Sequence, residues 1–148
     1  RIQMNRLSLI FLFSLILVAY CGNQAVGVKG TLMCGDQPLA GATVKLWELD
    51  TFPDPDDELA TVKTDSQGRF ELSGSESEIL SITPVLKIYH RCNNKGLFNL
   101  PKLCKRKVAY DIPKTYIVKG KSVSPSQYYN FGTMNMEAKQ KDEDTECI

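Results

Sequence analysis

Short runs in which apolar and polar residues alternate at every second position recur along most of this 148-residue chain. Val44 and Leu46, for example, alternate with Lys45 and Trp47, a period that places the two pairs on opposite faces of a β-strand. The same pattern predicts seven strands, near residues 26–34, 42–47, 59–63, 69–72, 83–92, 104–112 and 128–136. No segment has the period of a long amphipathic helix, so the sequence predicts an all-β protein.

Turn-forming sequences separate these runs. Gly35-Asp36-Gln37-Pro38 is a turn signal, and Asp65-Ser66-Gln67-Gly68 predicts a hairpin between two of the strands. Seven short strands joined in this way favour a seven-stranded antiparallel β-sandwich. We expect residues 73–81 to form a loop or one helical turn, residues 113–127 to be irregular, the core to span about 26–136, and 137–148 to be a charged tail.

The first 21 residues have the features of a secretory signal peptide. Residues 4–6 carry a positive charge, residues 7–19 are uncharged and mostly apolar, and small residues at Ala19 and Cys21 suit cleavage before residue 22. The 13-residue apolar run is shorter than the roughly 20 residues that span a bilayer as a helix. We therefore expect residues 1–21 to be removed and residues 22–148 to form one secreted, extracellular domain.

The charge balance gives no support for nucleic-acid binding. The chain has 18 Lys and Arg residues against 17 Asp and Glu residues, and its formal net charge is +1. A nucleic-acid-binding domain of this size is usually strongly basic. We expect no nucleic-acid partner and no cofactor, because phosphate-binding loops and dinucleotide fingerprints are also missing from the sequence.

Four cysteines follow the leader, at Cys34, Cys92, Cys104 and Cys147. An even number in an oxidising compartment implies two disulfides, and four cysteines allow three connectivities. We favour Cys92–Cys104 with Cys34–Cys147, because a hairpin between the strands near 83–92 and 104–112 would bring the first pair together. Zinc binding is the weaker interpretation, since no Cys-x-x-Cys pair is present and there is only one His.

A cluster of basic and apolar residues around residues 91–107 is the candidate binding rim. Such a surface suits an anionic lipid headgroup or an acidic receptor. The alternative is that the apolar members fold back and cover the end of the sandwich. The rim comprises Arg91, Lys95, Leu97, Phe98, Lys102, Lys105, Arg106 and Lys107.

Three other features have a structural and a functional interpretation. His90 shares a strand face with Leu86 and Ile88, which favours a buried structural His over a catalytic one. Trp47 is expected to pack beneath the following acidic loop, although an exposed Trp would mark an interface. That loop lacks the spacing of a calcium-binding loop, so we expect a solvated loop and no metal site; its acids are Glu48, Asp50, Asp54, Asp56, Asp57 and Glu58.

Several segments together resemble the nematode transthyretin-like family, in order along nearly all of residues 26–148. The resemblance implies a secreted, seven-stranded sandwich of transthyretin (prealbumin-like) type without a known general enzymatic activity. The loop from Asn94 to Leu103 is longer than the family pattern. The matching segments are residues 30–35, 44–47, 64–74 and 84–92, Arg106-Lys107-Val108, Ile112-Pro113 and Cys147.

Taken together, these features predict a non-enzymatic binding module. We expect it to act at cell surfaces or in extracellular fluid through loops at the ends of its strands, with an extracellular protein or lipid as partner. The alternative is a carrier of a small apolar ligand. In transthyretin the ligand channel lies between subunits, so the carrier hypothesis implies a transthyretin-like oligomer.

Overall fold

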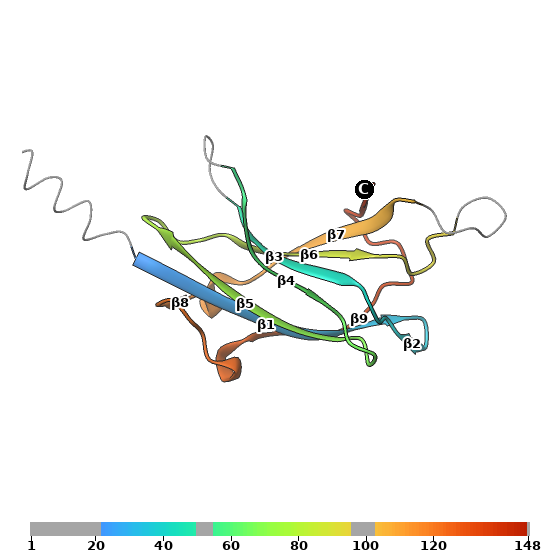
Figure 1. Cartoon of the computed structure of the whole chain (residues 1–148), viewed down its shortest axis with the longest axis horizontal. Helices are drawn as coiled ribbons and strands as arrows, with labels where there is room; N and C mark the ends of the chain where they lie inside the picture. The colour runs from blue at the N-terminus through green and yellow to red at the C-terminus, as the bar shows by residue number, and fades with distance from the viewer. Residues whose placement is uncertain (1–21, 50–54, 96–102, 148) are drawn as a thin grey trace, which may run out of the picture.

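The computed structural model describes residues 22–49, 55–95 and 103–147, so the predicted signal peptide lies outside the described residues. Two β-sheets pack face to face (Figure 1). The strands are β1 (Gly22–Cys34), β2 (Gln37–Pro38), β3 (Thr43–Glu48), β4 (Asp57–Lys63), β5 (Arg69–Glu78), β6 (Pro84–His90), β7 (Lys105–Asp111), β8 (Val118–Lys119), β9 (Tyr129–Asn135) and β10 (Asp144–Glu146). All seven predicted strands are present, and the structure contains three further short strands, β2, β8 and β10.

The β1 sheet has the order β2-β1-β5, and β8 and β9 pair with the other edge of β1. The β6 sheet has the order β10-β7-β6-β3-β4. All pairings are antiparallel except that of β1 with β9, which is parallel and shifts register between Lys29 and Gly30. The prediction of an all-β sandwich is confirmed, with this one parallel pair as the difference.

The core lies between the two sheets because alternate residues of each strand point inward. In β3, Val44 and Leu46 are fully buried while Lys45 and Trp47 are only partly covered. β6 lies between β3 and β7, and six of its seven residues are buried. Buried residues of the β1 sheet close the core from the other side; they include Val26, Val28, Leu32, Phe70 and Leu72.

The predicted turn at residues 65–68 forms through its side chains and its glycine. The carboxylate of Asp65 accepts hydrogen bonds from the backbone N–H groups of Gln67 at 2.8 Å and Arg69 at 2.9 Å. Gly68 has φ +73°, and a Cβ at this position would lie 2.2 Å from the carbonyl oxygen of Leu32. Both the dihedral angle and the close approach therefore require glycine here.

β5 runs further than the sequence predicted. It continues to Glu78 because its second half pairs with the start of β1, from Gly22 opposite Glu78 to Val26 opposite Gly74. The prediction of a loop at 73–81 is therefore wrong for residues 73–78. Residues 113–127 match the prediction of irregular chain more closely, with two single-turn 3-10 helices at Lys114–Tyr116 and Pro125–Gln127 and the two-residue β8.

The predicted disulfide pairing is wrong. The bonds are Cys34–Cys92, which joins the end of β1 to the segment after β6, and Cys104–Cys147. Cys92 is buried, on the inward face that it shares with Ile88, so it meets Cys34 of the opposite sheet. Cys104 instead meets Cys147 because β10 pairs with β7, with Glu146 opposite Lys105.

The charged tail contributes to the folded structure. β10 forms the edge of the β6 sheet, and Figure 1 shows the C-terminus beside β7. Glu143, just before β10, is partly buried and forms an ion pair with Arg106. No described helix is long and apolar enough to cross a membrane.

Candidate binding rim

The residues of the predicted rim fall into three groups. Arg91 and Lys95 are exposed beyond the end of β6, and Lys105 is partly buried at the start of β7. None of these three forms an ion pair with another described residue. Leu97, Phe98 and Lys102 lie outside the described residues.

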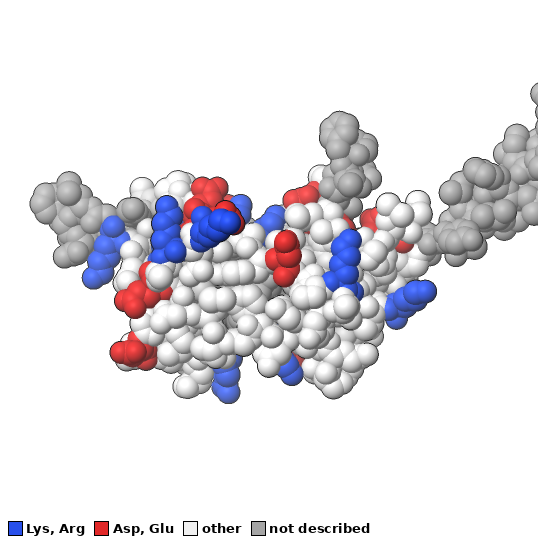
Figure 2. Space-filling view, turned by 180° about the vertical axis from the view of Figure 1, so that it is seen from behind, with Lys and Arg blue, Asp and Glu red and all other residues white. Residues whose placement is uncertain are grey.

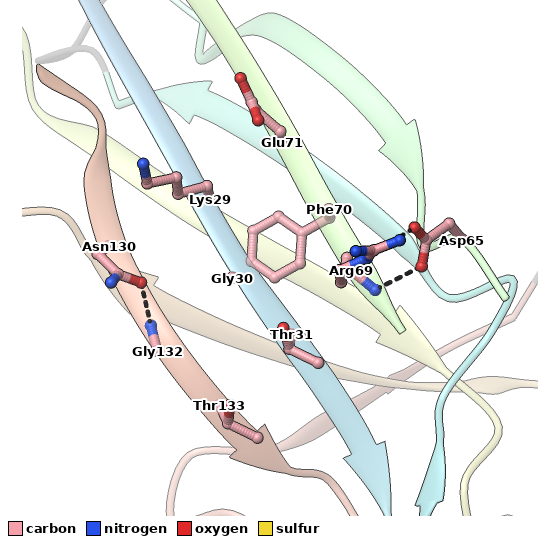
Figure 3. A pocket seen from close by; sticks show the side chains of 10 residues that line it. All are labelled: Lys29, Gly30, Thr31, Asp65, Arg69, Phe70, Glu71, Asn130, Gly132 and Thr133. Atoms are coloured by element: carbon pink, nitrogen blue, oxygen red, sulfur yellow. Dashed lines mark hydrogen bonds and ion pairs between the residues drawn. The ribbon is translucent and has the colours of Figure 1, made fainter. Parts of the chain in front are cut away.

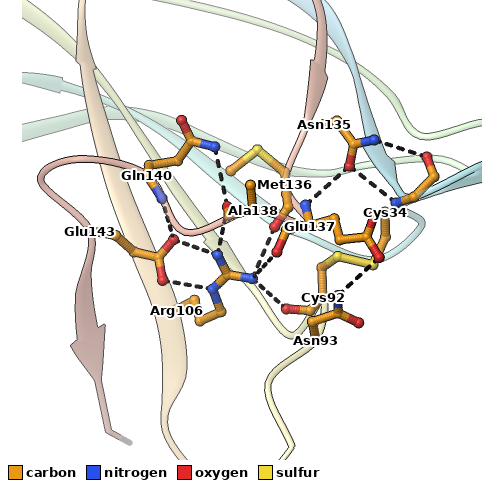
Figure 4. The surroundings of a disulfide bond; sticks show 11 residues. Cys34, Cys92, Asn93, Arg106, Asn135, Met136, Glu137, Ala138, Gln140 and Glu143 are labelled. Atoms are coloured by element: carbon orange, nitrogen blue, oxygen red, sulfur yellow. Dashed lines mark hydrogen bonds and ion pairs between the residues drawn. A yellow bond between two sulfur atoms is a disulfide. The ribbon is translucent and has the colours of Figure 1, made fainter.

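Arg106 does not belong to an exposed rim. It is 7% exposed, and its guanidinium forms an ion pair of 2.6 Å with the carboxylate of Glu143. It also donates hydrogen bonds to the backbone carbonyls of Cys92, Met136, Glu137 and Ala138 (Figure 4). The prediction of Arg106 as a contact residue is wrong because β7 turns it to the same inward face as Val108.

The Arg106 network sets the charge state of its carboxylate partner. The hydrogen bond from Arg106 is the main reason that the pKa of Glu143 lies below its ordinary value. The backbone N–H of Gln140 also donates to this carboxylate, at 3.2 Å. Arg106 and Glu143 therefore hold the segment after β9 against the β6 sheet.

Lys107 is directed to the outer face of the β6 sheet and is neutralised there. Its Nζ lies 2.9 Å from the carboxylate of Glu146 and 5.7 Å from the centre of the Tyr89 ring. The hydrogen bond to Glu146 raises the pKa of Lys107. Lys107 is therefore a less available contact for an anionic partner than Arg91, Lys95 or Lys105.

The tertiary structure adds residues that the sequence did not connect with the rim. Lys63 at the end of β4 and Thr43 at the start of β3 lie opposite each other in the ladder, and Tyr89 of β6 follows on the other side of Thr43. All three line a pocket with Arg91 and Lys105. The alternation in each strand places Lys63 and Thr43 on the outer face, but only the register brings them to the rim.

The charged residues of the molecule are otherwise well mixed. Figure 2 shows basic and acidic side chains interspersed along one face, with uncharged residues over much of the rest. Mixed charge of this kind creates no wide field of one sign. Recognition of a charged partner therefore depends on local groups of side chains.

His90 is buried, as predicted, with 2% of its surface exposed. Burial, followed by the positive charge of Arg106, lowers the pKa of His90 to about 4, so the imidazole is neutral at pH 7. Neither ring nitrogen has a hydrogen-bond partner among the described residues. No described carboxylate therefore bonds to the ring as a catalytic partner would.

Trp47 lies half-buried on the outer face of the β6 sheet. The Nζ of Lys87 is 4.2 Å from its ring centre, and that of Lys45 is 5.7 Å away. The acids around it are used in ion pairs, with Glu58 on Lys45 at 2.7 Å and Asp56 on Lys87 at 3.6 Å. Residues 50–54, which include Asp50 and Asp54 of the loop predicted to cover Trp47, lie outside the described residues.

Two further acids of the predicted loop, Glu48 and Asp57, lie among the described residues. Glu48 is buried, and its carboxylate accepts a hydrogen bond from the backbone N–H of Thr83 at 3.0 Å. Asp57 is exposed at the start of β4. Across the described part of the chain, no three His, Cys, Asp or Glu side chains are grouped closely enough to hold a metal ion.

A second concave surface lies across β1, β5 and β9, with a volume of about 560 Å³ (Figure 3). Gly30 and Gly132 contribute no side chain to it. Asp65 and Arg69 form an ion pair of 3.1 Å at its edge. The groove is open and mixed in charge, with Lys29 and Glu71 also lining it, so its side chains do not define one kind of ligand.

Comparisons with known proteins agree with this fold. A family model described as the transthyretin-like family matches residues 29–113. Transthyretin-like protein 33 of Caenorhabditis elegans is 44% identical over 150 residues, which cover 98% of this chain and 99% of that protein. Transthyretin-like protein 46 is 40% identical and transthyretin-like protein 5 is 39% identical, covering 98% and 96% of this chain and 78% and 99% of those C. elegans proteins.

The chain therefore belongs to the transthyretin-like family. Among solved structures, a 9R-lipoxygenase from Cyanothece aligns with a TM-score of 0.40 and 20% identity, over 90% of this chain and 21% of that one. A score this low carries no argument about fold or function.

Proposed function

We propose that this protein is a secreted, non-enzymatic binding module that recognises an anionic surface through the loops at one end of its sandwich. The observation that carries the proposal is that Arg91 and Lys95, beyond the end of β6, and Lys105, at the start of β7, have no ion pair with any described residue. Three other lysines of the same sheet, Lys45, Lys87 and Lys107, are neutralised by carboxylates. Cations without an internal partner are the ones that an anionic partner can engage at the lowest desolvation cost.

The position of the two disulfides supports the same proposal. Both disulfides lie at the end that carries the three cations, since Cys92 precedes Lys95 and Cys104 precedes Lys105. A rigid base reduces the entropy that these side chains lose on binding. The extracellular location that the leader predicts would keep both disulfides oxidised.

Co-sedimentation with vesicles tests the proposal. The oxidised protein is mixed with vesicles of phosphatidylcholine alone or with added phosphatidylserine, at low and at physiological salt. We expect binding only to the anionic vesicles and weaker binding at higher salt, because each basic residue near such a surface contributes about 1 kcal/mol and is screened by ions.

Two variants with the same change in charge provide the control. Replacing Arg91, Lys95 and Lys105 by Glu should abolish vesicle binding. Replacing Lys114, Lys119 and Lys121 by Glu should leave most of it, since these exposed lysines lie away from the rim, around β8. Equal losses in the two variants, or no binding by the parent protein at either salt concentration, would contradict an anionic lipid surface as the partner.

A further inference from the structure

The outer face of the β6 sheet contains two sets of basic residues that differ in their partners. Lys45, Lys87 and Lys107 each form an ion pair, with Glu58, Asp56 and Glu146. Lys63, Arg91 and Lys105, at the end of the same sheet, form none within the described chain. Glu146 lies opposite Lys105 in the ladder, but its carboxylate binds Lys107.

The second set surrounds a pocket of about 320 Å³. Residues 39–43 form one wall, and Lys63, residues 89–91 and Lys105 form the rest. None of the described residues that line this pocket is acidic. Its volume corresponds to about ten water molecules at roughly 30 Å³ each, so it has room for one phosphate or carboxylate group with part of its hydration shell.

The wall made by residues 39–43 is held in place by Thr64, which is 5% exposed. The Thr64 hydroxyl donates to the carbonyl of Leu39 at 2.6 Å and accepts from the N–H of Ala42 at 2.9 Å. The Thr64 carbonyl accepts from the N–H of Gly41 at 3.0 Å. The wall is therefore fixed before any ligand binds, which lowers the entropic cost of binding.

Neutral donors complete the lining. Lys63, Thr43 and Tyr89 follow one another across three neighbouring strands on one face of the sheet. The hydroxyls of Thr43 and Tyr89 form no hydrogen bond with a described residue, so both are available as donors. Burial raises the pKa of Tyr89, which keeps its hydroxyl protonated at neutral pH.

We propose that this pocket binds a single oxyanion group, a phosphate or a carboxylate, between Lys63, Arg91 and Lys105 with Thr43 and Tyr89 as hydrogen-bond donors. Cations and hydroxyl donors around one space suit a ligand that carries a negative charge and several acceptor atoms. The inference rests on the proposed function, because the pocket would hold one anionic group of the surface that the rim contacts. Lys63 and Thr43 line the pocket but lie outside the predicted rim. Substituting them therefore tests the pocket without changing a rim residue.

Nuclear magnetic resonance with inorganic phosphate tests the pocket directly. Sodium phosphate is added to the ¹⁵N-labelled, oxidised protein at pH 7, and sodium chloride of equal ionic strength is added to a matched sample. We expect saturable shifts of the amide signals of residues 41–43 and 63 with phosphate only. The double variant Lys63→Gln/Thr43→Val should bind phosphate at least about tenfold more weakly, because it removes one positive charge and one hydroxyl donor from the pocket.

Controls and further ligands complete the experiment. The double variant Lys119→Gln/Lys121→Gln should keep its phosphate affinity, and well-dispersed spectra show that each variant is folded. Acetate and phosphoserine, tested in parallel, distinguish a carboxylate from a phosphate group, and phosphoserine also represents a lipid headgroup without the membrane. The absence of saturable shifts with all three anions, or equal phosphate affinities of the pocket and control variants, would overturn the inference.

The vesicle assay then separates this inference from the proposed function. If the protein binds vesicles through Arg91, Lys95 and Lys105 but shows no saturable phosphate binding, the proposed function is supported and the oxyanion site in the pocket is contradicted. Saturable phosphate binding in a protein that ignores vesicles would support the pocket and contradict the lipid surface.

Discussion

The Arg106 guanidinium closes one end of the sandwich by binding the segment that connects β9 to β10. Residues 136–138 follow β9 and precede β10, and their three carbonyl oxygens all accept hydrogen bonds from Arg106. Buried carbonyls need such partners because they have lost their water. Arg suits this position since its planar group presents five donors in fixed directions.

Replacing Arg106 should therefore cost much more stability than replacing its neighbour in β7. We expect Arg106→Leu to lower the free energy of unfolding by about 3 kcal/mol or more, because Glu143 and the carbonyls lose their donor. Lys107→Leu, which removes a partly exposed ion pair, should cost less than about 1 kcal/mol. Urea unfolding followed by fluorescence measures both, and equal costs would contradict the network.

His90 should make the stability of the protein depend on pH between about 4 and 6.5. Its pKa is about 4 in the folded chain and about 6.5 in a model peptide, so the unfolded chain binds the proton more readily. The free energy of unfolding should thus fall as the pH drops from about 6.5 to 4, by up to about 3 kcal/mol.

The variant His90→Phe isolates this effect, because it keeps a ring of similar size without a titrating group. Urea unfolding at pH 7.0 and pH 4.5 should give a smaller difference for the variant than for the parent protein. Glu143 contributes stability that is lost at still lower pH, as its pKa lies below the ordinary value. An unchanged slope between pH 4.5 and 7.0 in His90→Phe would show that another group titrates.

At the scale of elements, β7 decides the disulfide pattern because it has a partner on each side. Continuing the β6–β7 register beyond His90 and Arg106 would place Cys92 opposite Cys104, which is the pairing that the hairpin argument predicted. The β7–β10 register, continued beyond Lys105 and Glu146, places Cys147 opposite Cys104. The Cys104–Cys147 bond depends on β10, which has only three residues, all of them polar. A segment this short shows no alternation from which a strand could be predicted.

Peptide mapping without reduction tests this connectivity. Digestion of the oxidised protein should give linked peptides that contain Cys34 with Cys92 and Cys104 with Cys147. Each bond closes a loop of similar length, with sequence separations of 58 and 43, so each should contribute about 4 kcal/mol in the chain-entropy model. A linked peptide containing Cys92 and Cys104 would contradict the structure.

Accessibility separates the two bonds further. Cys92 is 4% exposed, while Cys147 lies in the exposed C-terminal segment. A mild reductant should therefore open Cys104–Cys147 first, since a thiolate must reach the sulfur that it attacks. Stepwise alkylation followed by mass spectrometry would show the order.

At the scale of the whole molecule, the two ends of the sandwich differ. One end carries both disulfides and the three cations of the rim. The other carries Ile79 and Leu80, which are 63% and 74% exposed in the connection between β5 and β6. A binding module with one functional end can act as a monomer, whereas the carrier alternative requires a channel between subunits.

Light scattering after size-exclusion chromatography distinguishes the two hypotheses. The binding module allows a monomer, whereas the carrier of a small apolar ligand should form a stable tetramer. A tetramer that persists on dilution to nanomolar concentration would favour the carrier. A monomer at micromolar concentration would contradict it, because no intersubunit channel could then form.

Local alternation alone was enough to place the seven main strands and the inward face of those in the core. The period of two depends only on residues i and i+2, so Val44, Leu46, Leu86 and Ile88 could be placed in the core without knowing any partner strand. Arg106 lies two residues before Val108, so the same rule also puts it on the inner face, but a charged residue at that position has no visible partner in the sequence. The family resemblance, which the comparisons confirm, supplied the arrangement of the sheets.

Only the tertiary structure decided which distant residues meet. Arg106 and Glu143 are 37 residues apart, and Cys34 and Cys92 are 58 apart. Such contacts depend on strand order and register, which short polar strands such as β10 do not encode in their own pattern. Arg91 and Lys105 could be predicted as a basic rim because they flank one loop of the sequence. Lys63 and Thr43 lie far from that loop in the sequence, so only the folded chain shows that they lie beside the rim.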